Sequence, residues 1–332
     1  MVNTVQLEEI LGQFEIKLSN YEIVNIDEKK GWSAKYLYLI VEKNRQFILK
    51  GKSNNQIAGV LDEIIISSYL NSHGFTVRTP IKTKTNEYHL LKNDIYWDLK
   101  TYIPAAVLNF SEYNNETVNS LASLNTQYIK ASLNDPSIKN LGIKTKDYSD
   151  ISETLENIIL YHNILENVLG NTPKLFLEWF IFAQKEVKEI LNTNKDFSII
   201  HNDLNNKNIL VDLDSMKVVS FIDWDHGCIS TPLKDIIEPI NMFYEFAPQS
   251  YEQMRSEYLG AIKANYTITI PDSKLIFLQV YFYTLNKWNY ILTFAKLISE
   301  LGNSTNEKAD FENVIKNQIL KLNEIGKKYN IY

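Results

Sequence analysis

A polar loop between two apolar anchors constrains the fold of this chain more than any other feature of its sequence. The loop runs from His201 to Asn208, with Ile199-Ile200 before it and Ile209-Leu210-Val211 after it. Short apolar runs of this kind are typical of buried strands, so the loop between them is anchored at both ends. The sequence therefore predicts a loop that can present Asp203 and Asn208 inward.

A second apolar-rich run, Lys217 to Asp223, follows after the turn signal Asp214-Ser215. This pattern predicts a β-hairpin. A turn centred between Ser215 and Met216 would place Asp223 directly opposite Asn208, because paired positions in such a hairpin share one sum. Opposed Cβ atoms lie roughly 4.5–5.5 Å apart, so we expect these two side chains to meet across adjacent strands.

Asp203, Asn208 and Asp223 form the set of side chains that phosphoryl transfer requires. The reaction needs one carboxylate to accept the hydroxyl proton, and an amide with a second carboxylate to hold a metal ion on the phosphates. Mg²⁺ takes oxygen ligands of this kind. The spacing therefore indicates a phosphoryl-transfer centre.

Two segments carry a family resemblance, HNDLNNKNIL (201–210) and FIDWD (221–225). They resemble the aminoglycoside phosphotransferase and choline kinase group, small-molecule relatives of the eukaryotic protein kinases. The resemblance implies an α+β, bilobal, protein-kinase-like fold. Its small N-terminal lobe would be an antiparallel β-sheet with one helix, and its larger C-terminal lobe would be mainly helical and carry the catalytic loop and the hairpin.

The same resemblance implies roles for single residues. Asp203 would be the catalytic base, Asn208 and Asp223 would bind Mg²⁺, and Asp225 would lie beside the metal site as a further candidate metal residue. His201 belongs to the candidate catalytic loop. We favour a structural role for it, holding the shape of the loop, over a role in proton transfer, because Asp203 already fills that role.

A kinase also needs a nucleotide-binding lobe, and residues 35–41 and 45–50 are expected to form two of its strands. The second strand ends in Lys50, whose ammonium group needs an anionic partner if it is buried. Glu63 is the candidate, in an expected helix over residues 56–72 that Gly74 would end. The resemblance implies the same pair, with Lys50 on the α and β phosphates of ATP or GTP. The alternative is a surface lysine that ends a strand and a glutamate on a solvated helix face.

The phosphate-covering loop is expected over residues 27–34, where Gly31 and Ser33 would let backbone N–H groups approach a phosphate. No G-x-G-x-x-G motif is present, and an ordinary hairpin turn is the alternative. Thr101, Tyr102 and Ile103 resemble the hinge whose backbone holds the nucleotide base, and Pro104 then blocks the strand. We therefore expect an N-terminal nucleotide-binding lobe over 1–103 and a catalytic and acceptor-binding lobe over 104–332.

Helical periodicity dominates the rest of the chain, with amphipathic helices expected around residues 118–129, 158–168, 175–191, 275–301 and 311–325. Strands are expected over residues 74–80, and over 81–85 and 88–92 as a pair.

Composition limits the compartment and the partners. The net charge of −6 argues against a nucleic-acid surface, and no segment is apolar enough to suggest a membrane span. Cys228 is the only cysteine, so no disulfide can form within the chain and a reducing cytoplasm is the expected location.

We therefore expect an ATP- or GTP-dependent, Mg²⁺-dependent kinase that acts on a hydroxyl group of a small molecule, most plausibly an aminoglycoside-like or amino-alcohol acceptor. One alternative is a peptide or protein Ser/Thr kinase, although no Ala-Pro-Glu anchor follows Asp225. Another is a catalytically silent nucleotide-binding protein, which the glycine-poor loop would suit. The sequence leaves the oligomeric state and the identity of the acceptor open.

Overall fold

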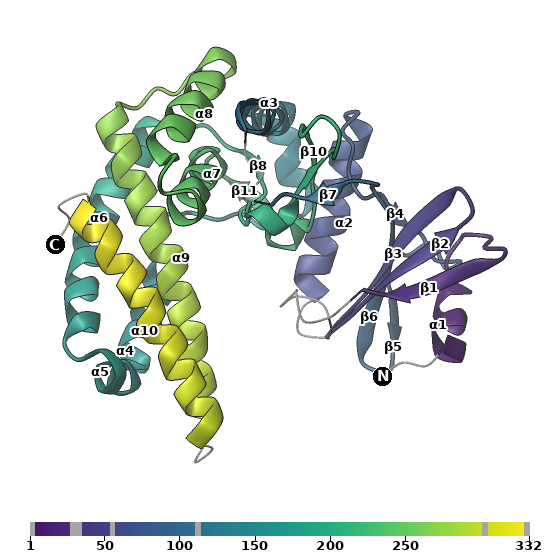
Figure 1. The fold of residues 1–332 in the computed structure, drawn as a ribbon, viewed down its shortest axis with the longest axis horizontal. Coiled ribbons are helices and arrows are strands. Elements are labelled where there is room, and N and C mark those ends of the chain that lie inside the picture. The colour runs from purple at the N-terminus through teal and green to yellow at the C-terminus, as the bar shows by residue number, and fades with distance from the viewer. Residues whose placement is uncertain (1–3, 27–34, 54–56, 110–113, 301–304, 329–332) are drawn as a thin grey trace.

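An antiparallel sheet and a mainly helical body form the two lobes of the computed structural model, as Figure 1 shows. The structure describes residues 4–26, 35–53, 57–109, 114–300 and 305–328. The expected bilobal α+β architecture is confirmed. The small lobe contains two helices, however, because a short helix that the sequence analysis did not predict precedes the sheet.

The N-terminal sheet has the strand order β1-β2-β3-β6-β4, with β5 also paired to β6. Its elements, with the two helices of this lobe, are α1 (Thr4–Leu11), β1 (Tyr21–Asn25), β2 (Tyr36–Glu42), β3 (Arg45–Ser53), α2 (Ile57–Ser72), β4 (Pro80–Ile81), β5 (Leu90–Lys92) and β6 (Ile95–Thr101). Residues 81–85 and 88–92 were expected to pair with each other, and this was wrong, because β4 and β5 each pair with β6.

The two faces of this sheet differ in chemistry, since side chains alternate along a strand. On one face Phe47, Leu49, Trp97 and Leu99 pack with α1 in an apolar cluster. The register pairs Lys50 with Asp98, so charged residues of β3 and β6 share the opposite face. That face is turned toward α2 and the second lobe.

Helix α2 links the lobes. Its residues Ile66 and Leu70 belong to the same hydrophobic core as the C-terminal lobe. The helix ends where the sequence predicts, and Gly74 follows with φ +83°, a left-handed conformation that favours glycine. The position of α2 therefore depends on the second lobe as well as on the sheet.

The C-terminal lobe contains a small three-stranded sheet of order β10-β9-β7 and a two-stranded sheet of order β11-β8. Its elements are β7 (Ala106–Val107), α3 (Asn115–Ser132), η4 (Pro136–Leu141), α4 (Ser152–Leu160), α5 (His162–Leu169), α6 (Thr172–Thr193), β8 (Ser198–Ile200), η5 (Asn206–Asn208), β9 (Ile209–Val211), β10 (Val218–Phe221), η6 (Trp224–His226), β11 (Cys228–Ser230), α7 (Leu233–Phe246), α8 (Tyr251–Asn265), α9 (Asp272–Glu300) and α10 (Thr305–Lys328).

Three of the expected helices, around 118–129, 275–301 and 311–325, correspond to α3, α9 and α10, and a fourth, 175–191, lies within α6. The helix expected over 158–168 is divided into α4 and α5 at Tyr161. Helices α9 and α10 lie side by side in the helical body (Figure 1). No helix in the described part of the chain combines the length and apolarity that crossing a bilayer requires.

The predicted hairpin is present as β9 and β10, but its register differs from the prediction by one residue. Phe221 pairs with Ile209, and the N–H of Ile222 donates to the carbonyl of Asn208 at 2.9 Å. The residue opposite Asn208 is therefore Ile222, and the predicted pairing with Asp223 was wrong. The reason is that the turn is centred one residue earlier than expected, between Asp214 and Ser215, as the pairing of Val218 with Val211 shows. An irregularity between Val218 and Ser220 then recovers part of the difference.

The chain leaves the N-terminal sheet after Thr101, and β7 begins at Ala106 in a different sheet. This is the segment in which the sequence places a boundary between 1–103 and 104–332. That boundary stays a prediction.

Candidate active site

Asp203 is held in the loop between β8 and β9 by two side-chain amides. Asn205 Nδ2 donates to Asp203 Oδ1 at 3.0 Å, and Asn208 Nδ2 donates to Asp203 Oδ2 at 3.1 Å and to its carbonyl at 2.8 Å. Asn208 is buried and Asp203 half-buried. A direct hydrogen bond therefore links the candidate base to the candidate amide ligand.

His201 is fully buried beneath this loop. Its Nε2 lies 2.8 Å from the carbonyl oxygen of Ile222. A carbonyl oxygen only accepts, so His201 donates from Nε2–H. The imidazole therefore ties the catalytic loop to the hairpin strand that leads to Asp223, an arrangement that favours a structural role over proton transfer.

Asp235, at the start of α7, also holds the loop, and the sequence analysis did not single it out. Its carboxylate accepts the backbone N–H of His201 at 2.5 Å and that of Asn202 at 2.9 Å. The side chain is 3% exposed. Burial raises the pKa of Asp235, an effect that the charge of His201 and the two N–H donors oppose.

Asp223 follows β10 in a left-handed backbone conformation, with φ 66° and ψ 58°. Its Oδ1 lies 2.5 Å from Lys50 Nζ, across the boundary between the lobes. Burial works against the charged forms of both groups. The mutual attraction is stronger, so the pKa of Lys50 is raised and that of Asp223 is lowered. Both groups therefore stay charged and face one another.

The expected ion pair between Lys50 and Glu63 was wrong. Glu63 Oε2 lies 2.7 Å from Lys100 Nζ, and Asp98 Oδ1 lies 2.8 Å from the same nitrogen. All three side chains are buried. The reason is that β6 brings a second lysine to the charged face of the sheet, where it is closer to α2 than Lys50 is. Glu63 still acts on Lys50 through its charge, which contributes to the raised pKa of that lysine.

Asp225 lies in η6, just beyond Asp223, and its carboxylate is engaged by Lys52 at 2.7 Å. The side chain of Asp225 is 10% exposed and that of Asp223 is 28% exposed. Of these two candidate metal residues, Asp223 is thus the one with more access to solvent.

The three hinge candidates are the last residue of β6, Thr101, and the two residues after it. The N–H groups of Thr101 and Tyr102 donate to carbonyls of Thr79 and Gln46, while the hydrogen bonds described for this part of the chain do not use the N–H of Ile103. Ile103 is part of a small apolar cluster with Leu210 and Ile222. Gly31 and Ser33, the candidates for phosphate contact, lie outside the described residues.

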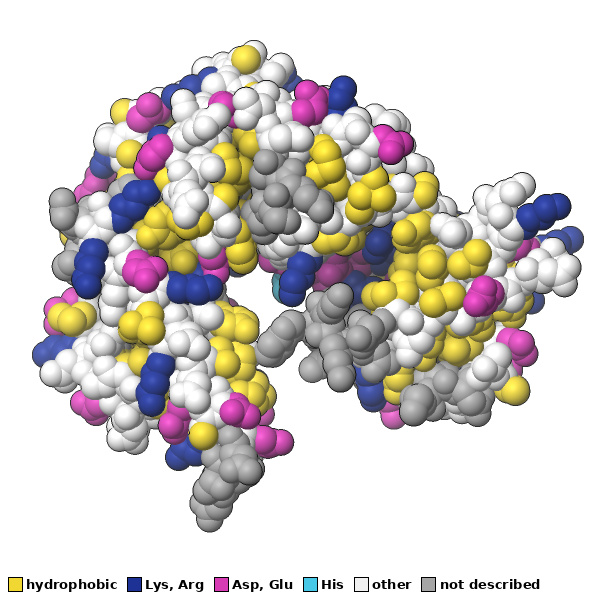
Figure 2. All heavy atoms as spheres, viewed as in Figure 1, with side chains coloured by type: hydrophobic (Ala, Val, Ile, Leu, Met, Phe, Trp, Pro, Cys, Tyr) yellow, Lys and Arg dark blue, Asp and Glu magenta, His cyan; other side chains and the backbone are white. Residues whose placement is uncertain are grey.

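A cluster of polar side chains on α7 and α9 lies near the candidate catalytic loop. Glu238 forms an ion pair with the buried Lys234 and accepts a hydrogen bond from Asn286 at 3.0 Å. Burial raises the pKa of Glu238, and the negative charge of Asp203 adds to the shift. Figure 2 shows a hollow between the helical body and the N-terminal lobe, with acidic and basic side chains in its roof.

This geometry agrees with a comparison against protein families. The model of the phosphotransferase enzyme family matches residues 29–267, which is more than half of the chain. The chain belongs to this family. No curated protein matches it.

Solved structures similar to this phosphotransferase family member share its fold over the full chain. Spectinomycin phosphotransferase, in complex with ADP and spectinomycin, has 13% sequence identity and a TM-score of 0.66, covering 100% of this chain and 99% of that one. An aminoglycoside phosphotransferase with GDP and kanamycin has 15% identity and a TM-score of 0.63, covering 98% and 99%. A microcompartment-associated aminopropanol kinase has 13% identity and a TM-score of 0.62, covering 99% of each chain.

Within this phosphotransferase site, sequence reasoning missed Asp235, Lys52 and Lys100. The sequence does contain a pattern that indicates Lys52 and Lys100. Lys52 follows Lys50 at the strand period of two, and Lys100 follows Asp98 at the same period between apolar residues that face the other way. Asp235 is followed directly by Ile236 and Ile237, and a carboxylate that such apolar neighbours bury needs a partner.

Proposed function

We propose that this protein transfers the γ-phosphoryl group of ATP or GTP to a hydroxyl group of a small molecule, with Mg²⁺ as cofactor. The observation that carries the proposal is the convergence of Asp203, Asn208, Asp223 and Lys50 from both lobes. Asp203 accepts a hydrogen bond from Asn208, and Asp223 forms an ion pair with Lys50 across the lobe boundary at 2.5 Å.

In the proposed reaction, the acceptor oxygen forms a bond to the γ-phosphorus while the bond between that phosphorus and the β–γ bridging oxygen breaks. The electron pair of the broken bond leaves with the nucleoside diphosphate. The hydroxyl proton goes to the carboxylate of Asp203. The side-chain amides of Asn205 and Asn208 hold that carboxylate in a fixed orientation. Alignment of the reacting groups supplies most of the rate enhancement in such reactions.

Lys50 would exchange one anionic partner for another when the donor binds. Its ammonium group is charged and paired with Asp223 in the described structure. Donor phosphates would take the place of that carboxylate as its partner. The purine base of the nucleotide would lie on the apolar cluster of Ile103, Leu210 and Ile222. The N–H of Ile103 would donate a hydrogen bond to this base.

The residues present fit a magnesium ion. The described hydrogen bonds of Asn208 use its Nδ2, which leaves the side-chain carbonyl oxygen as a possible ligand. Asp223 supplies a partly exposed carboxylate. Among the residues that the structure describes, no group of three His, Cys, Asp or Glu could hold a metal, so phosphate oxygens and water would complete the shell. When bound, the ion would neutralise charge on the phosphates.

We further propose an aminoglycoside-like or amino-alcohol acceptor. The support is the similarity in fold to a spectinomycin phosphotransferase, to a phosphotransferase solved with kanamycin, and to an aminopropanol kinase. A hydroxyl group near an amine is common to these acceptors.

A coupled nucleotide-consumption screen tests the proposal. The panel contains aminoglycosides, choline-like amino alcohols, homoserine and sugars, each with ATP and GTP. We expect one class to stimulate consumption, and Asp203→Asn to lower turnover by roughly 100-fold or more while binding of a fluorescent ADP analogue persists. Nucleotide binding without acceptor-dependent consumption anywhere in the panel would instead indicate a catalytically silent protein.

A further inference from the structure

Two lysines of β3 face two aspartates of the segment that follows β10. Lys50 Nζ lies 2.5 Å from Asp223 Oδ1, and Lys52 Nζ lies 2.7 Å from Asp225 Oδ2. Both lysines lie on the charged face of the N-terminal sheet, because residues two apart in a strand point the same way. Two neighbouring ion pairs therefore connect β3 to the segment after β10, and of these two the first has a place in the proposed reaction.

The two pairs differ in burial. The side chains of Lys50 and Asp223 are 9% and 28% exposed, whereas those of Lys52 and Asp225 are 1% and 10% exposed. A donor phosphate can reach the first pair. The second pair is buried away from solvent, and removal of one partner would leave the charge of the other buried and unpaired.

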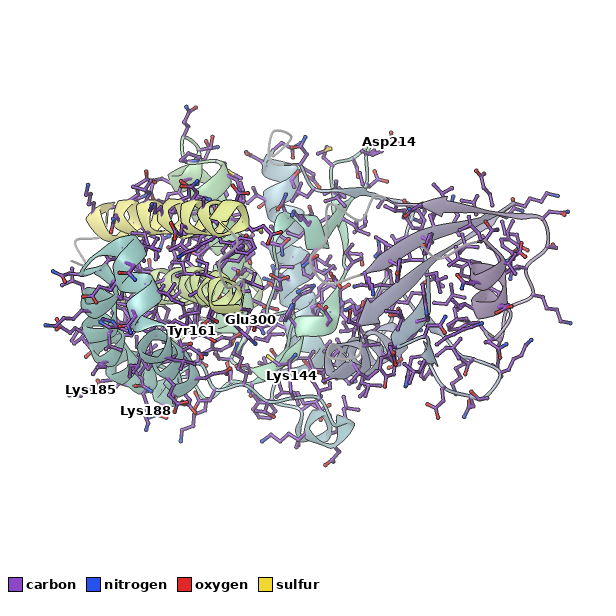
Figure 3. All side chains as sticks on the ribbon, turned by 90° about the horizontal axis from the view of Figure 1, so that it is seen from below. Lys144, Tyr161, Lys185, Lys188, Asp214 and Glu300 are labelled. Atoms are coloured by element: carbon purple, nitrogen blue, oxygen red, sulfur yellow. The ribbon has the colours of Figure 1, made fainter. Side chains whose placement is uncertain are left out.

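Further contacts fix Asp225 from the side of α2. Lys144 Nζ donates to the carbonyl of Asp225 at 3.2 Å and lies 3.4 Å from a carboxylate oxygen of Asp62 in α2. Figure 3 shows Lys144 near the junction of the two lobes. A Cβ atom on Gly59 of α2 would lie 2.9 Å from the carbonyl oxygen of Asp225, so only glycine allows this approach. Asp225 is thus clamped between β3, α2 and Lys144.

The clamp acts on a strained segment. Asp223 adopts φ 66° and ψ 58°, which is unfavourable for a residue with a side chain. Such a conformation persists only when the surrounding structure determines it. Asp225 is two residues away, and its ion pair with Lys52 anchors the segment that carries Asp223 to the N-terminal lobe.

We infer that Lys52 is a positioning residue: by neutralising and holding Asp225, it fixes the segment that presents Asp223 to the metal–nucleotide complex. Asp225 is then an anchor and not a metal ligand. This inference rests on the proposed function, because the group that Asp223 serves is the Mg²⁺ of the donor. Lys50 would contact the phosphates, whereas Lys52 forms its ion pair with Asp225 and positions Asp223 through that residue.

The test measures binding of fluorescent ADP and GDP analogues as a function of Mg²⁺ concentration, without an acceptor. The variants are Lys52→Met, Asp225→Leu and the double variant, in which an apolar pair replaces the ion pair. Lys92→Met is the matched control, because Lys92 also forms a lysine–carboxylate pair in the N-terminal lobe, with Glu9, but at the surface. Circular dichroism melts accompany each titration.

We expect Lys52→Met and Asp225→Leu each to raise the Mg²⁺ concentration for half-maximal binding by at least tenfold. In the double variant this Mg²⁺ concentration should lie within threefold of the wild-type value, since neither residue of the pair then carries a buried charge. Lys92→Met should have the wild-type value. If a single variant fails to fold, the double variant alone decides.

Two results would overturn the inference. One is an unchanged Mg²⁺ dependence in folded Lys52→Met. The other is a folded double variant that has lost Mg²⁺-dependent binding, because Asp225 would then be a ligand itself. Failure of the wild type to bind either nucleotide with Mg²⁺ would refute the proposed function instead, so the two failures are distinguishable.

Discussion

Replacement of Asp235 is the sharpest test of how the catalytic loop is held. The carboxylate is 3% exposed and accepts two backbone N–H groups, from His201 and Asn202. Asp235→Ala leaves both donors buried without a partner. A hydrogen bond to a charged group contributes about 1.5–3 kcal/mol, and an orphaned buried donor costs a similar amount.

The loss of two such bonds therefore lowers the free energy of unfolding by about 3–6 kcal/mol. The lower end is expected, because burial raises the pKa of Asp235 and so offsets part of the gain from its charge. For a chain of 332 residues, a loss of about 3 kcal/mol corresponds to a fall in Tm of roughly 4 °C. The effect on turnover should be larger than the effect on Tm, since Asp203 follows directly after the two N–H groups that lose their acceptor.

The assay combines a thermal melt with single-turnover phosphate transfer. Asp150→Ala is the control, because Asp150 also accepts a backbone N–H, that of Ser152 at 3.1 Å, but on an exposed surface where water replaces it. Asp235→Ala with an unchanged Tm and full turnover would show that the loop does not depend on this carboxylate.

Three further predictions follow. Lys50→Met should weaken binding of the donor nucleotide by at least tenfold in a fluorescence titration, because its ammonium is the group of β3 that faces Asp223 and the proposed phosphate site; unchanged affinity would remove its proposed role. Chelation with EDTA should abolish transfer and added Mg²⁺ should restore it in the coupled assay, whereas full activity in excess EDTA would refute the metal assignment. Burial raises the pKa of Cys228 to about 12, so at pH 8 about one thiol in ten thousand is ionised; a thiol-reactive dye should label only the unfolded protein, and rapid labelling of the native protein would contradict this.

The candidate catalytic residues could be grouped from the sequence because they lie close together in the chain. Asp203, Asn208 and Asp223 are separated by one loop and one hairpin, and local patterns of apolar residues determine both. The register of that hairpin could not be predicted, since neither the centre of its turn nor the irregularity between Val218 and Ser220 leaves a distinct signal in the sequence.

The partner of Lys50 illustrates a different limit. A buried lysine requires an anion, and the sequence offered Glu63, yet the fold supplies Asp223 to Lys50 and Lys100 to Glu63. Pairings across 37 or 173 positions depend on how sheet, helix and loop are packed. Residue type therefore predicts that a charge is compensated, whereas only the tertiary structure determines by which group.

The central claim is that the side chains of Asp203 and Asp223 act together on a phosphoryl group. Transfer of labelled γ-phosphate to an acceptor found in the screen tests it most directly, with wild type, Asp203→Asn and Asp223→Ala compared under equal nucleotide saturation. The account predicts transfer by the wild type, a loss of roughly 100-fold or more in Asp203→Asn and no measurable transfer in Asp223→Ala. Near-normal transfer by a folded Asp223→Ala variant would contradict it.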